Sequence, residues 1–244
     1  MKTLIIIPAR MSATRLPGKP LLKLNGISMV STVFKVASKA NIGDVIVAGA
    51  EQEIVDDVKH NGGNAILTDK DLKTGTDRIF QALKKYGSKD IDFVMNIQAD
   101  EPLIEINAIK NLDKEMKKNN AKIGTLAAKI DDEKKFKNPN IVKVITESKL
   151  NNSNFPLAKT FKREIDEIKD SIYHHIGVYC YSVESLKKFV NFNQSESEKK
   201  YRLEQLRALD NNIKINVKLT NHKPMGVDTY EDYMAIKKIL EYKN

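Results

Sequence analysis

The chain has 244 residues, of which 41% are hydrophobic and 30% are charged. This length and composition allow a sizeable buried core and exclude a disordered or fibrous chain. Lysine and arginine together number 41 against 32 acidic residues, and the formal net charge of +9 suits nucleic acid, a membrane surface or a small anionic substrate. Charge alone does not choose among these partners.

Other simple features narrow the choice. The only cysteine, Cys180, excludes an intrachain disulfide, and the N-terminal apolar run ends at Pro8, too early for a signal peptide or a membrane span. We therefore expect a cytoplasmic protein with no membrane partner. The lysines are scattered along helix-like stretches such as residues 110–118, as on a solvated helix face, and no basic and aromatic cluster resembles a nucleic-acid motif. We expect no nucleic-acid partner.

Strand and helix patterns alternate along the first half of the chain. Apolar, β-rich runs predict strands, and apolar positions at helical spacing predict the helices between them. The predicted strands lie at residues 3–7, 45–48, 65–67 and 93–97, and the predicted helices at 27–37, 54–58, 79–86 and 106–116. This order predicts the α/β class, with a mostly parallel sheet covered by helices on both faces.

The second half of the chain is less regular. Its predicted strands, at residues 123–129, 141–145, 175–181 and 213–219, indicate a mixed-sheet extension. We expect the pattern-poor stretches 150–170 and 193–198 to be mobile loops. The last helix is predicted from about Tyr230, with Thr229 as its cap and Asp232 completing a capping box.

The loop after the first strand carries several cations and no acidic residue. Ligands of open parallel sheets bind beyond the carboxyl ends of the strands, which is where this loop, residues 8–20, is expected. Arg10, Arg15 and Lys19, together with hydroxyl residues and a glycine, supply the donors that a triphosphate needs. We interpret the segment as a polyphosphate-binding loop. The usual glycine-rich motifs of kinases and dehydrogenases are absent, which disfavours both classes.

Acidic residues follow the strand predicted at residues 93–97. Asp100 and Glu101 are candidate ligands of Mg²⁺, which is usually held around a nucleotide by few carboxylates and several phosphate oxygens. By pattern alone, an acidic turn that caps the next helix explains them equally well. Asp228, just before the last helix, is a candidate partner whose distance from Asp100 the sequence does not show.

A further polar segment, TGTDR at residues 74–78, opens the third predicted helix. Its hydroxyl and N–H groups could contact a base or ribose, and Arg78 could bind a substrate carboxylate bidentately. Helix capping by Thr76 explains part of the pattern. The histidines form no recognisable constellation, so we expect no zinc site.

Several segments, in order from Ile5 to about Tyr233, together resemble one family, the 3-deoxy-manno-octulosonate cytidylyltransferases, also called CMP-KDO synthetases. They read IPARMSATRLPGKPL, TGTDR, NIQADEP, NPNIVKV, HHIGVYCYS, RLEQLRAL and GVDT. The resemblance implies a Rossmann-like, glycosyltransferase-A-type nucleotidyltransferase fold and a homodimer. It also implies a reaction in which CTP and the sugar acid KDO give CMP-KDO and pyrophosphate, for lipopolysaccharide biosynthesis.

The resemblance also assigns regions and residues. It implies one domain, with a nucleotide-binding half at about 1–120, sugar-binding and dimerisation elements at about 121–225, and a metal-ligand turn and helix at 226–244. The residues assigned to the nucleotide are Pro8, Ala9, Arg10, Arg15, Lys19, Thr74, Gly75 and Thr76. Those assigned to the sugar acid are Arg78, Gln98, His175, Tyr179, Glu204 and Gln205. Asp100 and Asp228 are assigned to Mg²⁺.

A direct displacement fits these assignments, with Arg10, Lys19 and Asp100 as the expected catalytic residues. The anomeric 2-hydroxyl of KDO would attack the α-phosphorus in line and pyrophosphate would leave, without a covalent enzyme intermediate.

The sequence departs from the family pattern at three places. Ala99 replaces a usual glycine, Gly49 and Ala50 stand near a usual Thr-Asp pair, and the stretch Asn151 to Pro156 lacks a usual arginine. The last departure concerns the sugar side, so 8-amino-KDO is an alternative substrate. A sialic acid is another, because cytidylyltransferases for both kinds of sugar acid share the basic loop and the acidic metal site. From other classes, the alternatives are a non-catalytic nucleic-acid-binding protein and an inactive regulatory homologue.

Overall fold

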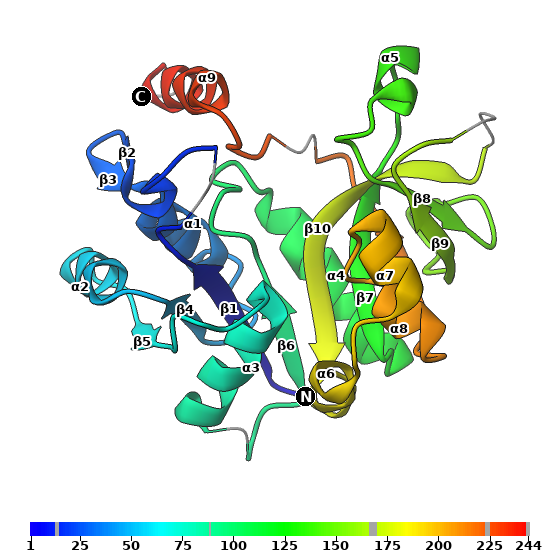
Figure 1. Cartoon of the computed structure of the whole chain (residues 1–244), viewed down its shortest axis with the longest axis horizontal. Coiled ribbons are helices and arrows are strands. Elements are labelled where there is room, and N and C mark those ends of the chain that lie inside the picture. Colours follow the sequence, from blue (N-terminus) through cyan, green and yellow to red (C-terminus); the bar gives the residue numbers. More distant parts are fainter. Residues whose placement is uncertain (13–14, 88, 166–169, 223–224, 243–244) are drawn as a thin grey trace. The chain divides into compact units, whose positions relative to one another are not determined.

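The computed structural model describes residues 1–12, 15–87, 89–165, 170–222 and 225–242 (Figure 1). The chain forms two compact units. The first unit comprises Met1–Ile109 with Pro224–Asn244, and the second comprises Lys110–Lys223. In the described residues, no helix combines the length and the apolar character needed to cross a bilayer.

The first unit is built on a parallel sheet. Its strands are β1 (Thr3–Ala9), β4 (Val45–Gly49), β5 (Ala65–Leu67) and β6 (Phe93–Asn96). Strand β1 pairs in parallel with β4 and β6, and β4 pairs in parallel with β5, which gives the order β6-β1-β4-β5. All of β1 is buried, so both faces of the sheet are covered, as its uninterrupted apolar sequence requires. The predicted parallel sheet is confirmed.

Helices cover this sheet at the predicted places. They are α1 (Met29–Ser38), α2 (Gln52–His60) and α3 (Gly75–Tyr86). Two further helices are the C-terminal α9 (Tyr230–Glu241) and α4 (Ile106–Asn119), which contains the boundary between the units. Helices α1 and α3 pack against β1, and α2 packs against β4 and β5. Ahead of α1 lie a 3-10 helix, Lys19–Leu21, and a hairpin of β2 (Lys23–Leu24) and β3 (Ile27–Ser28). Such short elements leave no periodic pattern in the sequence.

Capping residues fix where two of these helices begin. At α3, Thr74 Oγ1 accepts a hydrogen bond from Asp77 N at 3.1 Å, and Asp77 Oδ2 accepts one from Thr74 N at 3.2 Å. The cap is therefore Thr74, and the prediction of capping by Thr76 is wrong. At α9, the predicted capping box of Thr229 and Asp232 is confirmed.

The second unit contains a mixed sheet, as predicted. Its strands are β7 (Ile123–Ala128), β8 (Lys143–Thr146), β9 (Ala158–Lys162), β10 (Ile172–Ser182) and β11 (Ile215–Leu219). Strand β7 pairs in parallel with β11 and antiparallel with β10, and β8 pairs antiparallel with β10 and β9. The helices of this unit are α5 (Glu133–Lys137), α6 (Val183–Asn191), α7 (Glu196–Tyr201) and α8 (Leu206–Asp210).

Two predicted loops of the second unit are corrected by the structure. The stretch 150–170, of which 166–169 lie outside the described residues, contains strand β9, where Ala158 and Phe161 are buried between exposed or half-buried residues. The stretch 193–198 contains the start of α7, capped by Ser195. There the buried carboxylate of Glu198 accepts hydrogen bonds from Arg207 Nε at 2.8 Å and Nη2 at 2.6 Å. Strand β9 and the start of α7 depend on contacts with distant residues, and the local polar sequence gives no signal of such contacts.

Candidate active site

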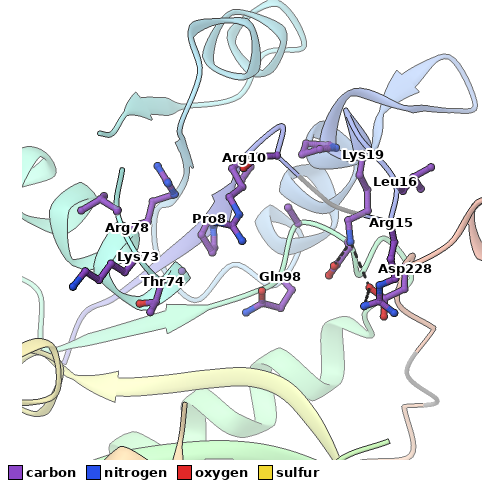
Figure 2. A pocket seen from close by; sticks show the side chains of 17 residues that line it. Pro8, Arg10, Arg15, Leu16, Lys19, Lys73, Thr74, Arg78, Gln98 and Asp228 are labelled. Atoms are coloured by element: carbon purple, nitrogen blue, oxygen red, sulfur yellow. Dashed lines mark hydrogen bonds and ion pairs between the residues drawn. The ribbon is translucent and has the colours of Figure 1, made fainter. Parts of the chain in front are cut away.

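A pocket of about 370 Å³ lies in the first unit, beyond the carboxyl ends of β1 and β6 (Figure 2). It is lined by Pro8, Ala9, Arg10, Ser12, Arg15, Leu16, Lys19, Pro20, Leu72, Lys73, Thr74, Gly75, Arg78, Gln98, Ala99, Asp100 and Asp228. The structure thus brings together the basic loop, the start of α3, the turn after β6 and the turn before α9. Of the site residues predicted in this unit, Glu101 and Thr76 do not line the pocket, and the side chain of Thr76 is buried.

Opposite charges meet on one side of this pocket. Lys19 Nζ donates to Asp100 Oδ2 at 2.6 Å and to the carbonyl oxygen of Val227 at 2.7 Å, and it lies 3.8 Å from Asp228 Oδ1. Arg15 Nη2 lies 3.0 Å from the same oxygen of Asp228 (Figure 2). The two carboxylates predicted as metal ligands therefore converge on a single ammonium group. The sequence did not show this convergence.

The turn that carries Asp100 is held by the segment before α9. Helix α4 begins only at Ile106, so Asp100 does not cap it. Instead, the carbonyl oxygen of Asp100 accepts a hydrogen bond from Val227 N at 2.9 Å. A Cβ atom on Gly226 would lie 3.2 Å from Glu101 Oε1, so a glycine permits this close approach. Two segments distant in the sequence are thereby joined at the pocket.

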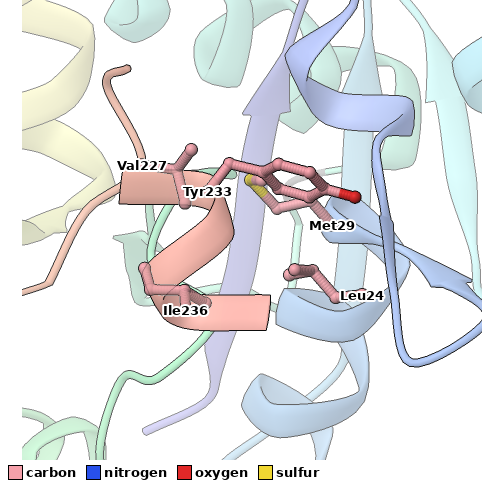
Figure 3. Packing of buried hydrophobic residues seen from close by; sticks show 5 residues of the cluster. All are labelled: Leu24, Met29, Val227, Tyr233 and Ile236. Carbon is pink, nitrogen blue, oxygen red and sulfur yellow. The ribbon is translucent and has the colours of Figure 1, made fainter. Parts of the chain in front are cut away.

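A small apolar cluster anchors the same segment and thus Asp228. The cluster consists of Leu24, Met29, Val227, Tyr233 and Ile236 (Figure 3). Val227 is fully buried, and Tyr233 Oη donates to the carbonyl oxygen of Lys23 at 2.7 Å. Because Asp228 directly follows Val227, packing of α9 against the hairpin and α1 determines the position of this carboxylate. This packing explains how a residue just before the last helix, Asp228, comes to lie at the pocket.

Arg78 stands at the other side of the pocket and is itself held by the protein. Its Nη1 donates to Thr68 Oγ1 at 2.5 Å and to the carbonyl oxygen of Asp69 at 3.0 Å. Burial lowers the pKa of the Arg78 guanidinium, and the carboxylate of Glu51 counteracts this by raising it. An arginine remains cationic despite such a shift. Its predicted contact with a substrate carboxylate stays a prediction.

Six further residues line the pocket although sequence reasoning did not assign them individually to a ligand: Ser12, Leu16, Pro20, Leu72, Lys73 and Ala99. Lys73 directly precedes the TGTDR segment, so its positive charge could have indicated from the sequence that it lies at the anion-binding pocket. The leucines and Pro20 carry no polar group, and only the fold shows that they face a cavity.

Four of the predicted sugar-side residues lie in the second unit. His175 Nε2 is 3.0 Å from Thr125 Oγ1, and burial lowers the pKa of His175 to about 3. The ring of Tyr179 lies 5.4 Å from that of His175. Burial raises the pKa of the Tyr179 phenol, and the nearby carboxylate of Glu204 adds to this effect. Gln205 follows Glu204 directly and precedes α8.

The hydroxyl of Tyr179 is buried without a hydrogen-bond partner among the described residues. A buried polar group costs free energy when it is unpaired, and such groups usually have a partner. The geometry around Tyr179 therefore favours a polar ligand at this position over a purely structural role.

The described part of the chain contains no cluster of three or more His, Cys, Asp or Glu residues suited to a metal ion. Asp100 and Asp228 instead provide a pair of carboxylates beside a basic pocket. A pair of this kind suits Mg²⁺, which takes one or two protein carboxylates and completes its shell with phosphate oxygens and water.

Known proteins resemble this chain over nearly its whole length. Residues 4–215 match a family model described as cytidylyltransferase. The chain is 40% identical over 243 residues to a 3-deoxy-manno-octulosonate cytidylyltransferase of Rhodopseudomonas palustris, which covers 99% of this chain and 98% of that protein. A protein of the same name from Nitrobacter winogradskyi is 38% identical over 240 residues, which covers 98% of this chain and 94% of that one.

Solved structures confirm the predicted fold. A CMP:2-keto-3-deoxy-manno-octonic acid synthetase complexed with CTP matches with a TM-score of 0.90 and 29% identity, over 100% of both chains. A UDP-glucose pyrophosphorylase complexed with UDP-glucose matches with a TM-score of 0.73, and its 14% identity shows a shared fold alone.

Proposed function

The chain belongs to the 3-deoxy-manno-octulosonate cytidylyltransferase family, and from this membership we propose that it transfers CMP from CTP to KDO and releases pyrophosphate. The observation that carries the proposal is the convergence of Lys19, Asp100 and Asp228 in a pocket that Arg10 and Arg15 also line. Cations and carboxylates together suit a polyphosphate bound with a divalent ion. A pocket of about 370 Å³ is within the usual range for small ligands.

We propose that the nucleotide binds along the basic loop and the start of α3. Arg10, Arg15 and Lys19 would donate to the phosphate oxygens. The N-terminal end of α3, where Thr74 and Gly75 line the pocket, would contact the nucleoside or a phosphate. Pro8 and Ala9, at the end of β1, would lie beneath the nucleoside, as the family resemblance implies. Thr76 is buried and would act on the nucleotide only through the backbone of this turn.

We propose Mg²⁺ as the cofactor, held by Asp100 and Asp228. The support is chemical: both carboxylates already converge on one positive charge, the Lys19 ammonium. When bound there, Mg²⁺ would neutralise phosphate charge and orient the attacking hydroxyl. Lys19 would then exchange its carboxylate partner for a phosphate oxygen.

The proposed reaction is a single in-line displacement. The anomeric 2-hydroxyl oxygen of KDO forms a bond to the α-phosphorus of CTP, and the bond from that phosphorus to the pyrophosphate oxygen breaks. Pyrophosphate leaves with the bonding electrons, and the hydroxyl proton passes to solvent. Arg10, Arg15 and Lys19 stabilise the charge that develops on the leaving group, and binding of both substrates to the enzyme supplies the alignment.

We propose that His175, Tyr179, Glu204 and Gln205 recognise the sugar acid. The buried, unpartnered hydroxyl of Tyr179 supports this role, because a sugar hydroxyl or carboxylate would complete its hydrogen bonding. His175 is neutral at ordinary pH and can donate or accept one hydrogen bond at each ring nitrogen. The family resemblance adds Arg78 and Gln98, which line the pocket of the first unit.

The structure of the stretch Asn151 to Pro156 supports a second sugar acid as an alternative substrate. The stretch that lacks the family's usual arginine closes on itself: Asn151 Oδ1 accepts hydrogen bonds from Ser153 N at 2.8 Å and Asn154 N at 2.9 Å. Asn154 Nδ2 donates to the carbonyl oxygen of Lys149 at 2.8 Å. Because this loop presents amides in place of a cation, 8-amino-KDO, which carries a positive group of its own, is the alternative substrate.

The experiment is a comparison of sugar acids. Purified protein is incubated with CTP, with and without Mg²⁺, and pyrophosphate release is measured for KDO, 8-amino-KDO and a sialic acid. We expect Mg²⁺-dependent release that is fastest with KDO. Faster release with 8-amino-KDO or sialic acid would reassign the substrate, and no release with any sugar acid would contradict the proposed function.

We also propose a homodimer, on the family resemblance alone. Light scattering should then give twice the chain mass of 27.6 kDa, and a mass equal to that of one chain would contradict the proposal.

A further inference from the structure

Glu51 lies directly after β4 and touches the basic loop. The ladder between β1 and β4 extends to the pair Ala9 and Gly49, and just past it Ala50 N donates to the carbonyl oxygen of Ala9 at 2.9 Å. Beyond this point, Glu51 Oε2 accepts a hydrogen bond from the backbone N–H of Met11 at 3.0 Å. This hydrogen bond joins the segment after β4 to the segment after β1, at the residue that follows Arg10.

This contact is not a helix cap. Glu51 occupies the N-cap position of α2, where an acidic side chain ordinarily accepts a hydrogen bond from the first turn of its own helix. Its side chain makes no such bond, while its backbone carbonyl accepts from Ile54 N at 3.2 Å. The carboxylate of Glu51 therefore hydrogen-bonds to the neighbouring basic loop and not to the first turn of α2.

Met11 is also hydrogen-bonded to the residue before Lys19. The carbonyl oxygen of Met11 accepts a hydrogen bond from Gly18 N at 3.1 Å, which closes the basic loop. Gly18 has a φ of 69°, a left-handed conformation that glycine adopts without strain, and it caps the 3-10 helix that begins with Lys19. Fixing Met11 therefore fixes the backbone on both sides of the loop, next to Arg10 and next to Lys19.

The charge of Glu51 has a second consequence. Arg10 and Arg78 both line the pocket (Figure 2). After burial, which lowers the pKa of Arg78, the largest influences are Glu51, which raises this pKa, and Arg10, which lowers it. The carboxylate of Glu51 thus partly offsets the mutual repulsion of two guanidinium groups in one pocket.

We propose that Glu51 is a positioning residue for the triphosphate: by holding Met11 it sets where Arg10 and Lys19 present their charges. The inference rests on the proposed function, because it supposes that these cations bind the phosphates of CTP. Glu51 itself does not line the pocket and acts through the loop.

Three variants of the full chain test this role. Glu51→Ser shortens the side chain so that it no longer reaches Met11, and it places a good N-cap residue at the start of α2, so the helix should still form. Glu51→Gln keeps an acceptor oxygen at the same reach and removes only the charge. Glu53→Ser is the matched control, since Glu53 is an exposed acidic residue in the first turn of the same helix. Thermal melting verifies the fold of each variant.

The measurements are the Kd for CTP by calorimetry and the steady-state KM and kcat for CTP. We expect Glu51→Ser to weaken CTP binding and raise KM by about tenfold, the size of one lost hydrogen bond to a charged group, with a smaller change in kcat. Glu51→Gln should recover most of the affinity, and Glu53→Ser should match the wild type.

Wild-type affinity in Glu51→Ser would overturn the inference. It would also be overturned if Glu51→Gln were as weak as Glu51→Ser, because charge alone would then act, or if Glu53→Ser were equally weak. The proposed function fails separately: it is contradicted if the wild-type protein releases no pyrophosphate with any sugar acid.

Discussion

The ammonium of Lys19 lies 2.6 Å from Asp100 Oδ2, with the lysine side chain only 15% exposed. A residue predicted to bind phosphate is thus paired with a residue predicted to bind metal. The pair keeps opposite charges together in a partly desolvated pocket, where an unpaired charge would cost free energy. In the proposed function, binding of phosphate and metal exchanges the partners of this pair.

Asp100→Asn should leave the fold intact and lower kcat by about a hundredfold or more, because an amide is a much weaker ligand for Mg²⁺ than a carboxylate. The asparagine oxygen can still accept a hydrogen bond from Lys19, so melting should change little. Pyrophosphate release at limiting Mg²⁺ measures the effect, with the exposed Asp131→Asn as the charge-matched control. Near-normal turnover at limiting Mg²⁺ would show that Asp100 is not a metal ligand.

Lys19→Gln should strengthen Mg²⁺ binding in the absence of CTP while it weakens CTP binding. The ammonium competes with a metal ion for Asp100 and Asp228, and its removal leaves two carboxylates with less positive charge between them. Calorimetric titration with Mg²⁺ alone measures this effect without turnover. Arg15→Gln, which removes a 63% exposed cation from Asp228, should increase Mg²⁺ affinity less. Unchanged or weaker Mg²⁺ binding by Lys19→Gln would refute the competition.

Acid should destabilise the protein through two histidines of the second unit. Burial lowers the pKa of His175 from the usual 6.5 to about 3. Burial and the nearby charge of Lys135 lower the pKa of His174 to about 4. The unfolded chain therefore binds protons first. Stability that is complete above about pH 6.5 is lost as the pH falls toward these lower values, with a slope of up to about 1.4 kcal/mol per pH unit for each histidine.

Urea unfolding between pH 7.5 and pH 4.5 measures this loss. His175→Gln and His174→Gln should each show a shallower fall in the free energy of unfolding than the wild type, although either substitution lowers stability at neutral pH. His60→Gln, at an exposed position on α2, is the control and should keep the wild-type slope. Identical slopes in all four proteins would mean that neither imidazole controls acid unfolding.

Arg207→Met should destabilise the second unit by about 3–5 kcal/mol, because it leaves the buried carboxylate of Glu198 without its partner. Burial alone would raise the pKa of Glu198, but hydrogen bonds from Arg207 outweigh this and lower it. Chemical denaturation measures the loss, and Lys199→Met, which breaks an exposed pair with Glu196, should cost less than about 1 kcal/mol. Equal costs for the two variants would refute the importance of the buried pair.

Much of the first unit could be predicted because its elements are long and periodic. The apolar run of β1 and the helical spacing of α1 to α4 follow from burial on one or both faces. The pocket residues at strand ends were predicted from the sheet rule, which places ligands at carboxyl ends.

What could not be predicted depends on contacts between distant segments. Strand β9 is ordered by pairing with β8, and α7 by the ion pair of Glu198 with Arg207. The approach of Asp228 to Lys19 follows from packing of Val227 in an apolar cluster, which no local pattern encodes. For the same reason, the hydrogen bond from Met11 to Glu51 gave no signal in the sequence.

Phosphorus NMR of the complete reaction tests the central claim most directly. With the wild-type protein, CTP, KDO and Mg²⁺, the account predicts that the CTP signals decline while pyrophosphate and a single new phosphodiester, from CMP joined to the sugar, grow in equal amounts. Formation of CDP and orthophosphate, of CMP without a sugar phosphodiester, or no change in CTP would contradict transfer of CMP to the sugar acid.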